Sequence, residues 1–311
     1  MASDQSRYQK EAAQVLSHHG KSFNFARAFL SKDHAVNGAR LYAFCRRLDD
    51  IADDNPNPEI ARAKLKAVDL QLLRQTAPED WVGDFLELAE DTQMDIAVAR
   101  QLLAGVLSDL EEVRFETKAQ LIQYAYSVAG TVGLMMCDVF HVTNPKARPF
   151  AIDLGIAMQL TNIARDIQED AENNRRYVPG DWVQNSHPCD IANPTERLKP
   201  FLQEAVGRLL DLADVYYDSA RDGLSYLPNR PRLSILVASS VYREIGVKLR
   251  RKQCKTWQGR VFVGLGRKLT LAAQAFWAFG TDRSLRHTET THDLNLHSDI
   301  RCTYKIRLGV R

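Results

Sequence analysis

The chain has 311 residues, of which 45% are hydrophobic and 26% are charged, an ordinary composition for a globular protein. Its formal net charge of +2 is too small to indicate nucleic acid as a partner. Five scattered cysteines without a Cys-x-x-Cys pair argue against a disulfide framework or a zinc site, and favour a reducing cytosol.

Helical periodicity dominates the chain. The i, i+3, i+4, i+7 spacing of amphipathic helices predicts helices over about 33–54, 58–76, 99–110, 118–142, 147–171, 195–222, 231–253 and 267–280. No stretch alternates with the period of two that is typical of strands. We therefore predict an all-α fold in a single domain, with irregular segments at 172–194 and from about 281. No run approaches the ~20 apolar residues of a spanning helix, and the N-terminus does not resemble a signal peptide, so we expect a cytoplasmic protein.

Two aspartate clusters lie in separate predicted helices, RRLDDIADD at 46–54 and QLTNIARDIQED at 159–170. Residues three or four apart share a helix face. This spacing predicts two polar stripes, one of Tyr42, Arg46, Asp49 and Asp53 and the other of Gln159, Asn162, Asp166 and Asp170. Like charges four apart cost about 0.2–0.5 kcal/mol per pair. A hard divalent cation such as Mg²⁺, which prefers carboxylate oxygens and bridges to phosphates, would offset that cost.

The surroundings of the stripes decide between two interpretations. A polar stripe usually faces water, but both helices are otherwise apolar, and buried charges need partners or metal. We therefore interpret the stripes as facing each other around metal and anion, with Arg46 and Arg165 as donors to phosphate oxygens. Asp50 and Asp54 also stand four apart, which leaves an alternative register one residue round the helix. We favour Asp49 and Asp53 because they share the face of Tyr42 and Arg46.

Three further features carry weaker signals. Tyr126, Gly130 and Gly133 share one face, which indicates either close helix packing or a smooth wall for a long apolar ligand. His19, Lys21 and Ser22 surround Gly20 in what could be an anion-binding turn. Gly264-Leu265-Gly266 lacks the third glycine of a dinucleotide site and is rejected as one. The histidines at 287, 292 and 297 are interpreted as part of a polar tail.

Together these motifs resemble those of the head-to-head prenyl synthases, the family of squalene, dehydrosqualene and phytoene synthases, over residues 15–280. Residues 42–54 resemble the first aspartate-rich motif of that family, and 157–171 resemble the second. Residues 128–136 and 241–248 are most similar to bacterial phytoene synthases. The resemblance implies an isoprenoid-synthase helical bundle around a central cavity in residues 1–280, followed by a polar C-terminal tail at 281–311.

The resemblance also implies roles for individual residues. Mg²⁺, or Mn²⁺ in its place, would be held directly or through water by Asp49, Asp53, Asn162, Asp166 and Asp170. The prenyl diphosphate would be bound by His19, Lys21, Ser22, Tyr42, Arg46, Gln159, Asn162, Arg165, Tyr242 and Arg260. Tyr126 is interpreted as a polar contact near the reacting carbons, and 175–182 as a lid over the diphosphates.

The implied reaction is Mg²⁺-dependent condensation of two geranylgeranyl diphosphates to phytoene through a cyclopropylcarbinyl diphosphate. The main alternative is the same chemistry on farnesyl diphosphate, giving dehydrosqualene or squalene. No nucleotide fingerprint is found, so NADPH is not expected. Two alternatives of another class are a non-catalytic protein on the same scaffold and an all-α interaction module.

A hydrocarbon product would need an exit to a membrane. Phe276, Trp277 and Phe279, near Arg267 and Lys268, indicate either a contact with anionic lipid or the buried end of a core helix. The buried helix end is the favoured interpretation.

Overall fold

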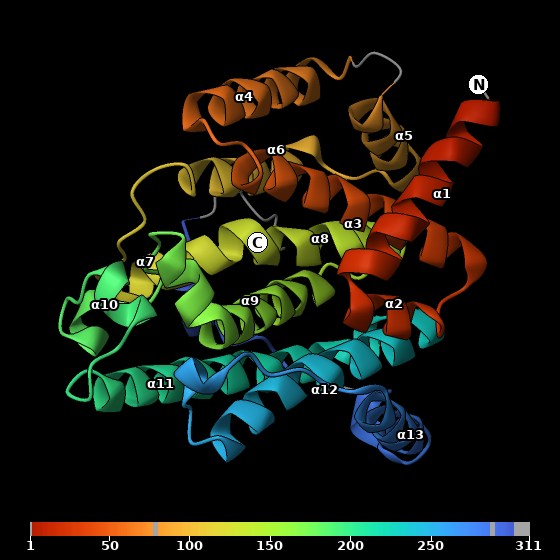
Figure 1. Ribbon diagram of the computed structural model, residues 1–311. Coiled ribbons are helices and arrows are strands. Elements are labelled where there is room, and N and C mark those ends of the chain that lie inside the picture. The colour runs from red at the N-terminus through yellow and green to blue at the C-terminus, as the bar shows by residue number, and fades with distance from the viewer. Residues whose placement is uncertain (1, 77–79, 287–289, 302–311) are drawn as a thin grey trace.

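The computed structural model describes residues 2–76, 80–286 and 290–301, and within them the regular structure is helical (Figure 1). The first six helices are α1 (Ala2–His19), α2 (Lys21–Arg27), α3 (Lys32–Asp53), α4 (Pro58–Arg74), α5 (Trp81–Thr92) and α6 (Ile96–Ser108). They are followed by α7 (Lys118–Ala125), a π-helical segment η1 (Tyr126–Gly130), α8 (Thr131–Val139), α9 (Ala147–Glu172) and α10 (Pro188–Ala192). The last three are α11 (Lys199–Asp222), α12 (Asn229–Arg251) and α13 (Leu265–Thr281).

The prediction of an all-α fold is confirmed. The segments predicted from periodicity correspond to α3, α4, α6, α9, α11, α12 and α13, with ends that differ by a few residues. The segment predicted as one helix at 118–142 is divided into α7, η1 and α8. Sequence periodicity did not identify α1, α2, α5 or α10.

The boundaries of α3 place the first aspartate cluster in its last turns. Ser31 caps the start of α3, where its hydroxyl accepts a hydrogen bond from the His34 amide at 3.3 Å, as N-cap serines do. The helix stops before Asn55-Pro56, since a residue preceding proline is displaced from helical geometry. Asn57 then caps α4, with Pro58 in its first turn. Asp49 and Asp53 therefore lie in the last turns of α3, whose end is fixed by the proline and by the capped start of α4 that follows.

Helix α9 lies at the centre of the molecule, between α8 on one side and α11 and α12 on the other (Figure 1). Its approach to α8 and η1 is backbone to backbone. A Cβ at Gly133 would lie 2.1 Å from the carbonyl oxygen of Ala151, and one at Gly155 would lie 2.2 Å from that of Ala129. Glycine is required at both positions because no side chain fits there. The close-packing interpretation of the glycine-rich segment therefore holds at Gly133.

Candidate active site

A cavity of about 380 Å³ lies between α2, α3, α8, α9 and α12. Its wall is mostly apolar, with contributions from Leu41, Val132, Met136, Leu154 and Ile235. The polar and charged residues on the lining are Arg27, Tyr42, Cys45, Asp49, Gln159, Asn162, Ser234 and Tyr242. Asp49 and Asn162 belong to the two separate aspartate motifs. The fold therefore brings the two motifs to one apolar cavity.

Two carboxylates at this site have raised pKa values. Asp49 is accessible to solvent along the cavity, yet it is surrounded by enough protein that desolvation, followed by repulsion from Asp53, raises its pKa to about 7. Burial, followed by repulsion from Asp166, likewise raises the pKa of Asp170 well above its usual value. Both shifts report negative charge with too little compensation, which a bound cation would supply.

Asn162 presents an oxygen that has no partner among the described residues. Its side-chain nitrogen donates to Gln159 Oε1 at 3.3 Å, whereas its Oδ1 atom is buried and accepts no hydrogen bond. Such an unpaired buried acceptor costs about 1–3 kcal/mol. A neutral amide oxygen beside carboxylates is a hard donor set that suits a divalent cation. The residues present therefore fit a divalent metal.

Arg175 connects the two motifs, and the charge of Asp109 acts on an aspartate of each. Arg175 donates from Nη1 to Asp53 Oδ1 at 2.9 Å, and its positive charge also acts on Asp170, in the direction that lowers the pKa of that residue. Asp109, just beyond α6, accepts hydrogen bonds from Tyr177 at 2.8 Å and Tyr124 at 2.9 Å. Burial raises the pKa of Asp109 to about 6. Asp109 could not be found from the sequence, because it lies outside any motif and Tyr177 is 68 positions away in the chain.

The arginines predicted to bind diphosphate are already paired with carboxylates. Arg165 Nε donates to Asp166 Oδ1 at 2.8 Å, and Arg260 Nε lies 2.9 Å from the same oxygen. Arg260 also contacts Glu169 at 2.8 Å. Arg46 pairs with Asp50 at 2.6 Å and is absent from the cavity lining. Three cationic groups thus stand beside the aspartates, two of them on Asp166.

The remaining predicted contacts are divided between the cavity and its surroundings. Tyr42, Gln159 and Tyr242 line the cavity. His19 and Lys21 are exposed where α1 meets α2, and Ser22 is half-buried; none of the three is on the lining. Gly20 between them is buried against Tyr42, whose Cζ atom would lie 2.9 Å from an added Cβ. The turn therefore adjoins the cavity without opening into it.

Tyr126 does not lie where the sequence analysis predicted. Its side chain is fully buried and absent from the cavity lining, and its hydroxyl donates to Gln101 Oε1 at 3.1 Å. The prediction assumed regular α-helical spacing from Tyr126 to Gly133. The π-helical segment η1 inserts an extra residue into this turn, which rotates Tyr126 away from the face of Gly133. Only Gly133 of the predicted face of Tyr126, Gly130 and Gly133 lines the cavity.

The segment predicted as a lid is fixed to a neighbouring strand-like stretch. The Arg176 amide donates to the Val113 carbonyl at 3.0 Å, and the Gly180 amide donates to that of Phe115 at 2.9 Å. The Arg176 side chain is buried and contacts Glu116 at 2.6 Å. Arg175 alone of the two arginines reaches an aspartate of the motifs. The segment thus holds Arg175 in place over the site.

Comparisons with known proteins match most of the chain. The squalene/phytoene synthase family model matches residues 16–267, a range that includes both aspartate motifs. A 15-cis-phytoene synthase from Enterobacter agglomerans is 35% identical over 287 residues, which cover 88% of this chain and 97% of the relative. A phytoene synthase from Pseudescherichia vulneris is 32% identical and covers 85% of this chain and 89% of the relative. A crystal structure of a dehydrosqualene synthase in complex with ligand matches with a TM-score of 0.81 and 25% identity, over 90% of this chain and 99% of that one.

Proposed function

Because the chain belongs to the squalene/phytoene synthase family, we propose that it is a prenyltransferase of the phytoene synthase type. It joins two molecules of geranylgeranyl diphosphate head to head through a cyclopropylcarbinyl diphosphate, and so forms phytoene for carotenoid biosynthesis. The observation that carries this proposal is the position of Asp49 and Asn162, from two distant motifs, on one apolar cavity.

The family depends on a divalent metal, and we propose Mg²⁺ as the ion. The proposed ligands offer only oxygen atoms, which is the donor type that Mg²⁺ prefers; they are Asp49, Asp53, Asn162, Asp166 and Asp170. When bound, the ions act as Lewis acids that stabilise the departing diphosphate. The raised pKa of Asp49 and the unpaired Oδ1 atom of Asn162 support this assignment, because both penalties are relieved by a cation.

The arginines beside the carboxylates are proposed to hold the diphosphates. Guanidinium groups bind phosphate oxygens through paired hydrogen bonds, and Arg165, Arg175 and Arg260 already stand at the aspartates. Burial raises the pKa of Tyr42 to about 12, so its hydroxyl keeps its proton. We propose that this hydroxyl donates a hydrogen bond to the substrate at the boundary between the polar site and the apolar wall.

The wall of the cavity is proposed to protect the carbocations. Loss of diphosphate leaves an allylic cation, which the double bond of the second substrate attacks. Water would quench this cation, and a wall of leucine, valine, methionine and alanine side chains excludes it. The apolar length of the cavity also holds the two prenyl chains so that their reacting carbons meet.

The experiment that tests the function is product analysis with the purified chain. It is incubated with Mg²⁺ and either labelled geranylgeranyl or labelled farnesyl diphosphate, and the hydrocarbons are extracted. We expect phytoene from the C20 substrate. Dehydrosqualene or squalene from the C15 substrate alone would support the alternative, and the absence of hydrocarbon from both would support a non-catalytic protein.

A matched pair of variants tests the register of the first motif. Asp49→Asn is expected to lower kcat by about a hundredfold or more, the scale of losing one preorganised electrostatic group. Asp54→Asn is the control, because Asp54 is exposed and lies on the neighbouring stripe. Equal losses in both variants would contradict the assignment of Asp49 and Asp53 as the ligand pair.

We also propose that α13 contacts a membrane and so offers an exit for the product. Leu265, Leu269, Phe276 and Trp277 expose between 50% and 75% of their surface on this helix, and Phe262 precedes it at 70%. The buried-end interpretation therefore does not apply to Trp277. Lys248, Arg250 and Arg251 lie in the last turn of the adjacent α12, and such basic residues favour anionic lipid. The structure differs from the expectation at Lys268, which is buried and donates to the Lys21 carbonyl at 3.1 Å.

The position of α13 relative to the cavity supports this exit. Phe276 packs edge-on against Phe29 at 5.4 Å between ring centroids, and the next residue, Leu30, lines the cavity. No described helix is long and apolar enough to cross a bilayer. Trp277→Glu is expected to reduce flotation with anionic liposomes, whereas Leu70→Glu, at an exposed position on α4, serves as the control. Unchanged flotation of the Trp277 variant would remove the membrane contact.

A further inference from the structure

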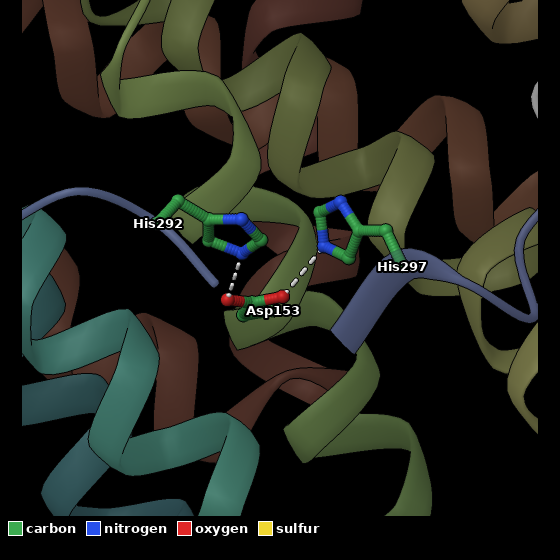
Figure 2. A group of neighbouring side chains, drawn as sticks. All are labelled: Asp153, His292 and His297. Atoms are coloured by element: carbon green, nitrogen blue, oxygen red, sulfur yellow. Dashed lines mark hydrogen bonds and ion pairs between the residues drawn. The ribbon is translucent and has the colours of Figure 1, made fainter. Parts of the chain in front are cut away.

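A second group of possible metal ligands lies where the C-terminal part of the chain meets α9, and none of its members is on the cavity lining. Asp153 is fully buried, and Figure 2 shows the rings of His292 and His297 meeting its carboxylate from two sides. His292 Nε2 lies 2.8 Å from Asp153 Oδ2, and His297 Nε2 lies 2.7 Å from Oδ1. One ligand atom from each residue falls within 4.8 Å of the others. Ser219 adds a hydrogen bond to Oδ2 at 2.5 Å.

The two histidines come from the C-terminal segment, defined here as residues 290–301. Other polar contacts also join this segment to the body of the protein. The Tyr216 hydroxyl donates to the Leu296 carbonyl at 2.8 Å, the Arg301 amide donates to Gln123 Oε1 at 2.5 Å, and Lys118 Nζ lies 3.6 Å from Asp299 Oδ2. Both histidine side chains are nonetheless well covered, with exposed fractions of 6% for His292 and 14% for His297. Such burial of two imidazoles in a short segment calls for a specific partner.

The chemistry of the cluster points to a metal rather than to an ordinary ion pair. Both carboxylate oxygens of Asp153 are engaged, Oδ2 by His292 and Ser219 and Oδ1 by His297. A carboxylate that is fully buried, as Asp153 is, needs a cation or strong hydrogen-bond donors beside it. Neutral imidazole nitrogens and a carboxylate oxygen together form a donor set that selects zinc and related transition metals over Mg²⁺.

We propose that Asp153, His292 and His297 bind one zinc-class divalent ion that fastens the C-terminal segment to α9. The spacing of the histidines, His-x4-His across the short 3-10 helix Leu294–His297, lies within the range of known zinc ligands. Zinc bonds of about 2.0–2.2 Å place the donors of a four-coordinate site within roughly 4 Å of one another, so small side-chain shifts complete the site. Water fills the fourth position. The lack of a Cys-x-x-Cys pair does not count against this site, because none of its ligands is a cysteine.

The consequence of this site concerns α9. Asp153 lies within three turns of Asn162 on the same helix, on a face that does not line the cavity. An ion at Asp153 would join α9, α11 through Ser219, and the C-terminal segment at one point. It would act as a structural fastener behind the helix that carries the second aspartate motif. The proposal does not depend on the reaction that the cavity catalyses.

The test measures metal content and stability of the full chain. The purified protein is dialysed against zinc-free buffer that contains Mg²⁺, and its zinc is measured by plasma mass spectrometry. We expect about one zinc ion per chain, together with a fall in Tm on chelation that added zinc reverses. His292→Ala/His297→Ala is expected to lose both properties, and Asp153→Asn to bind zinc more than about tenfold more weakly, since even changes in surrounding groups cost that much.

The control addresses adventitious zinc at the surface. His187 Nδ1 and Cys189 Sγ lie 3.3 Å apart and both residues are exposed, so His187→Ala/Cys189→Ser removes a pair of zinc donors at the surface. This variant is expected to retain the zinc and its effect on Tm. The proposal is overturned if the wild-type chain retains no zinc and added zinc does not change its Tm. The three residues would then form a hydrogen-bonded cluster without a metal. The proposal is equally overturned if the His292/His297 variant retains as much zinc as the wild type.

Discussion

Replacing Gly155 by alanine tests whether the contact between α9 and η1 is as close as the structure shows. The added Cβ would lie 2.2 Å from the Ala129 carbonyl oxygen and 2.7 Å from the Gly130 nitrogen. An ordinary contact begins at 3.4 Å, and both neighbours are backbone atoms that cannot rotate away. The two helices must therefore separate by roughly 1 Å in an interior that is packed as densely as a crystal.

The expected magnitude follows from two opposing contributions. Overpacking a core costs about 1–3 kcal/mol, and the upper end applies where backbone must move. Alanine in place of a helical glycine contributes about 0.5–1 kcal/mol of stability in return. The net loss is about 2 kcal/mol, which in a chain of this size corresponds to a fall in Tm of about 3 °C.

The assay is thermal and urea denaturation, with Gly207→Ala as the matched control. Gly207 lies inside α11 and a Cβ there would meet nothing within 4 Å, so this variant is expected to gain about 0.5–1 kcal/mol. The two glycine-to-alanine changes thus have opposite signs. A Gly155 variant as stable as the wild type, or a Gly207 variant that loses as much, would refute the reasoning.

Three further predictions concern the site. The pKa of Asp49 is raised to about 7, so the folded state binds the proton of this carboxyl group more tightly than the unfolded state does. The metal-free protein is therefore expected to lose stability as pH rises towards 7, and Tm measured across pH 5–8 checks the sign. Affinity for Mg²⁺ with a diphosphate analogue, measured by calorimetry, is expected to change the other way and to weaken below pH 7, because the metal must displace the proton; equal affinity at pH 6 and 8 would contradict this. Arg175→Ala is expected to lower kcat/KM about tenfold or more with little change in Tm. Arg176→Ala removes the buried contact with Glu116 and is expected to lower Tm. The reverse pattern would show that Arg175 is structural.

The sequence was sufficient to predict most of the long helices and which residues of the two aspartate motifs share a helix face, because both depend on spacing within one helix. Periodicity identified α9, and the register that favoured Asp49 over Asp50 agrees with Asp49 on the cavity lining. Tyr126 was misplaced because a single π-helical turn has no spacing signal of its own.

Contacts between distant segments could not be predicted in this way. Asp109 meets Tyr177 across 68 positions of the chain, and His297 meets Asp153 across 144. Nothing local distinguishes these residues from solvated neighbours, and the two tail histidines were accordingly interpreted as polar surface. His287, the third histidine of that interpretation, lies outside the described residues.

The arginine–aspartate pairs have a consequence for the order of events at the site. Arg175 is engaged with Asp53, and Arg260 with Asp166. A cation that binds the carboxylates would release these guanidinium groups from their ion pairs. A diphosphate that binds the guanidinium groups would in turn release the carboxylates. Each ligand thereby frees the groups that bind the other. Because coupling between two binding sites is reciprocal, the cation and the diphosphate must raise each other's affinity by the same factor.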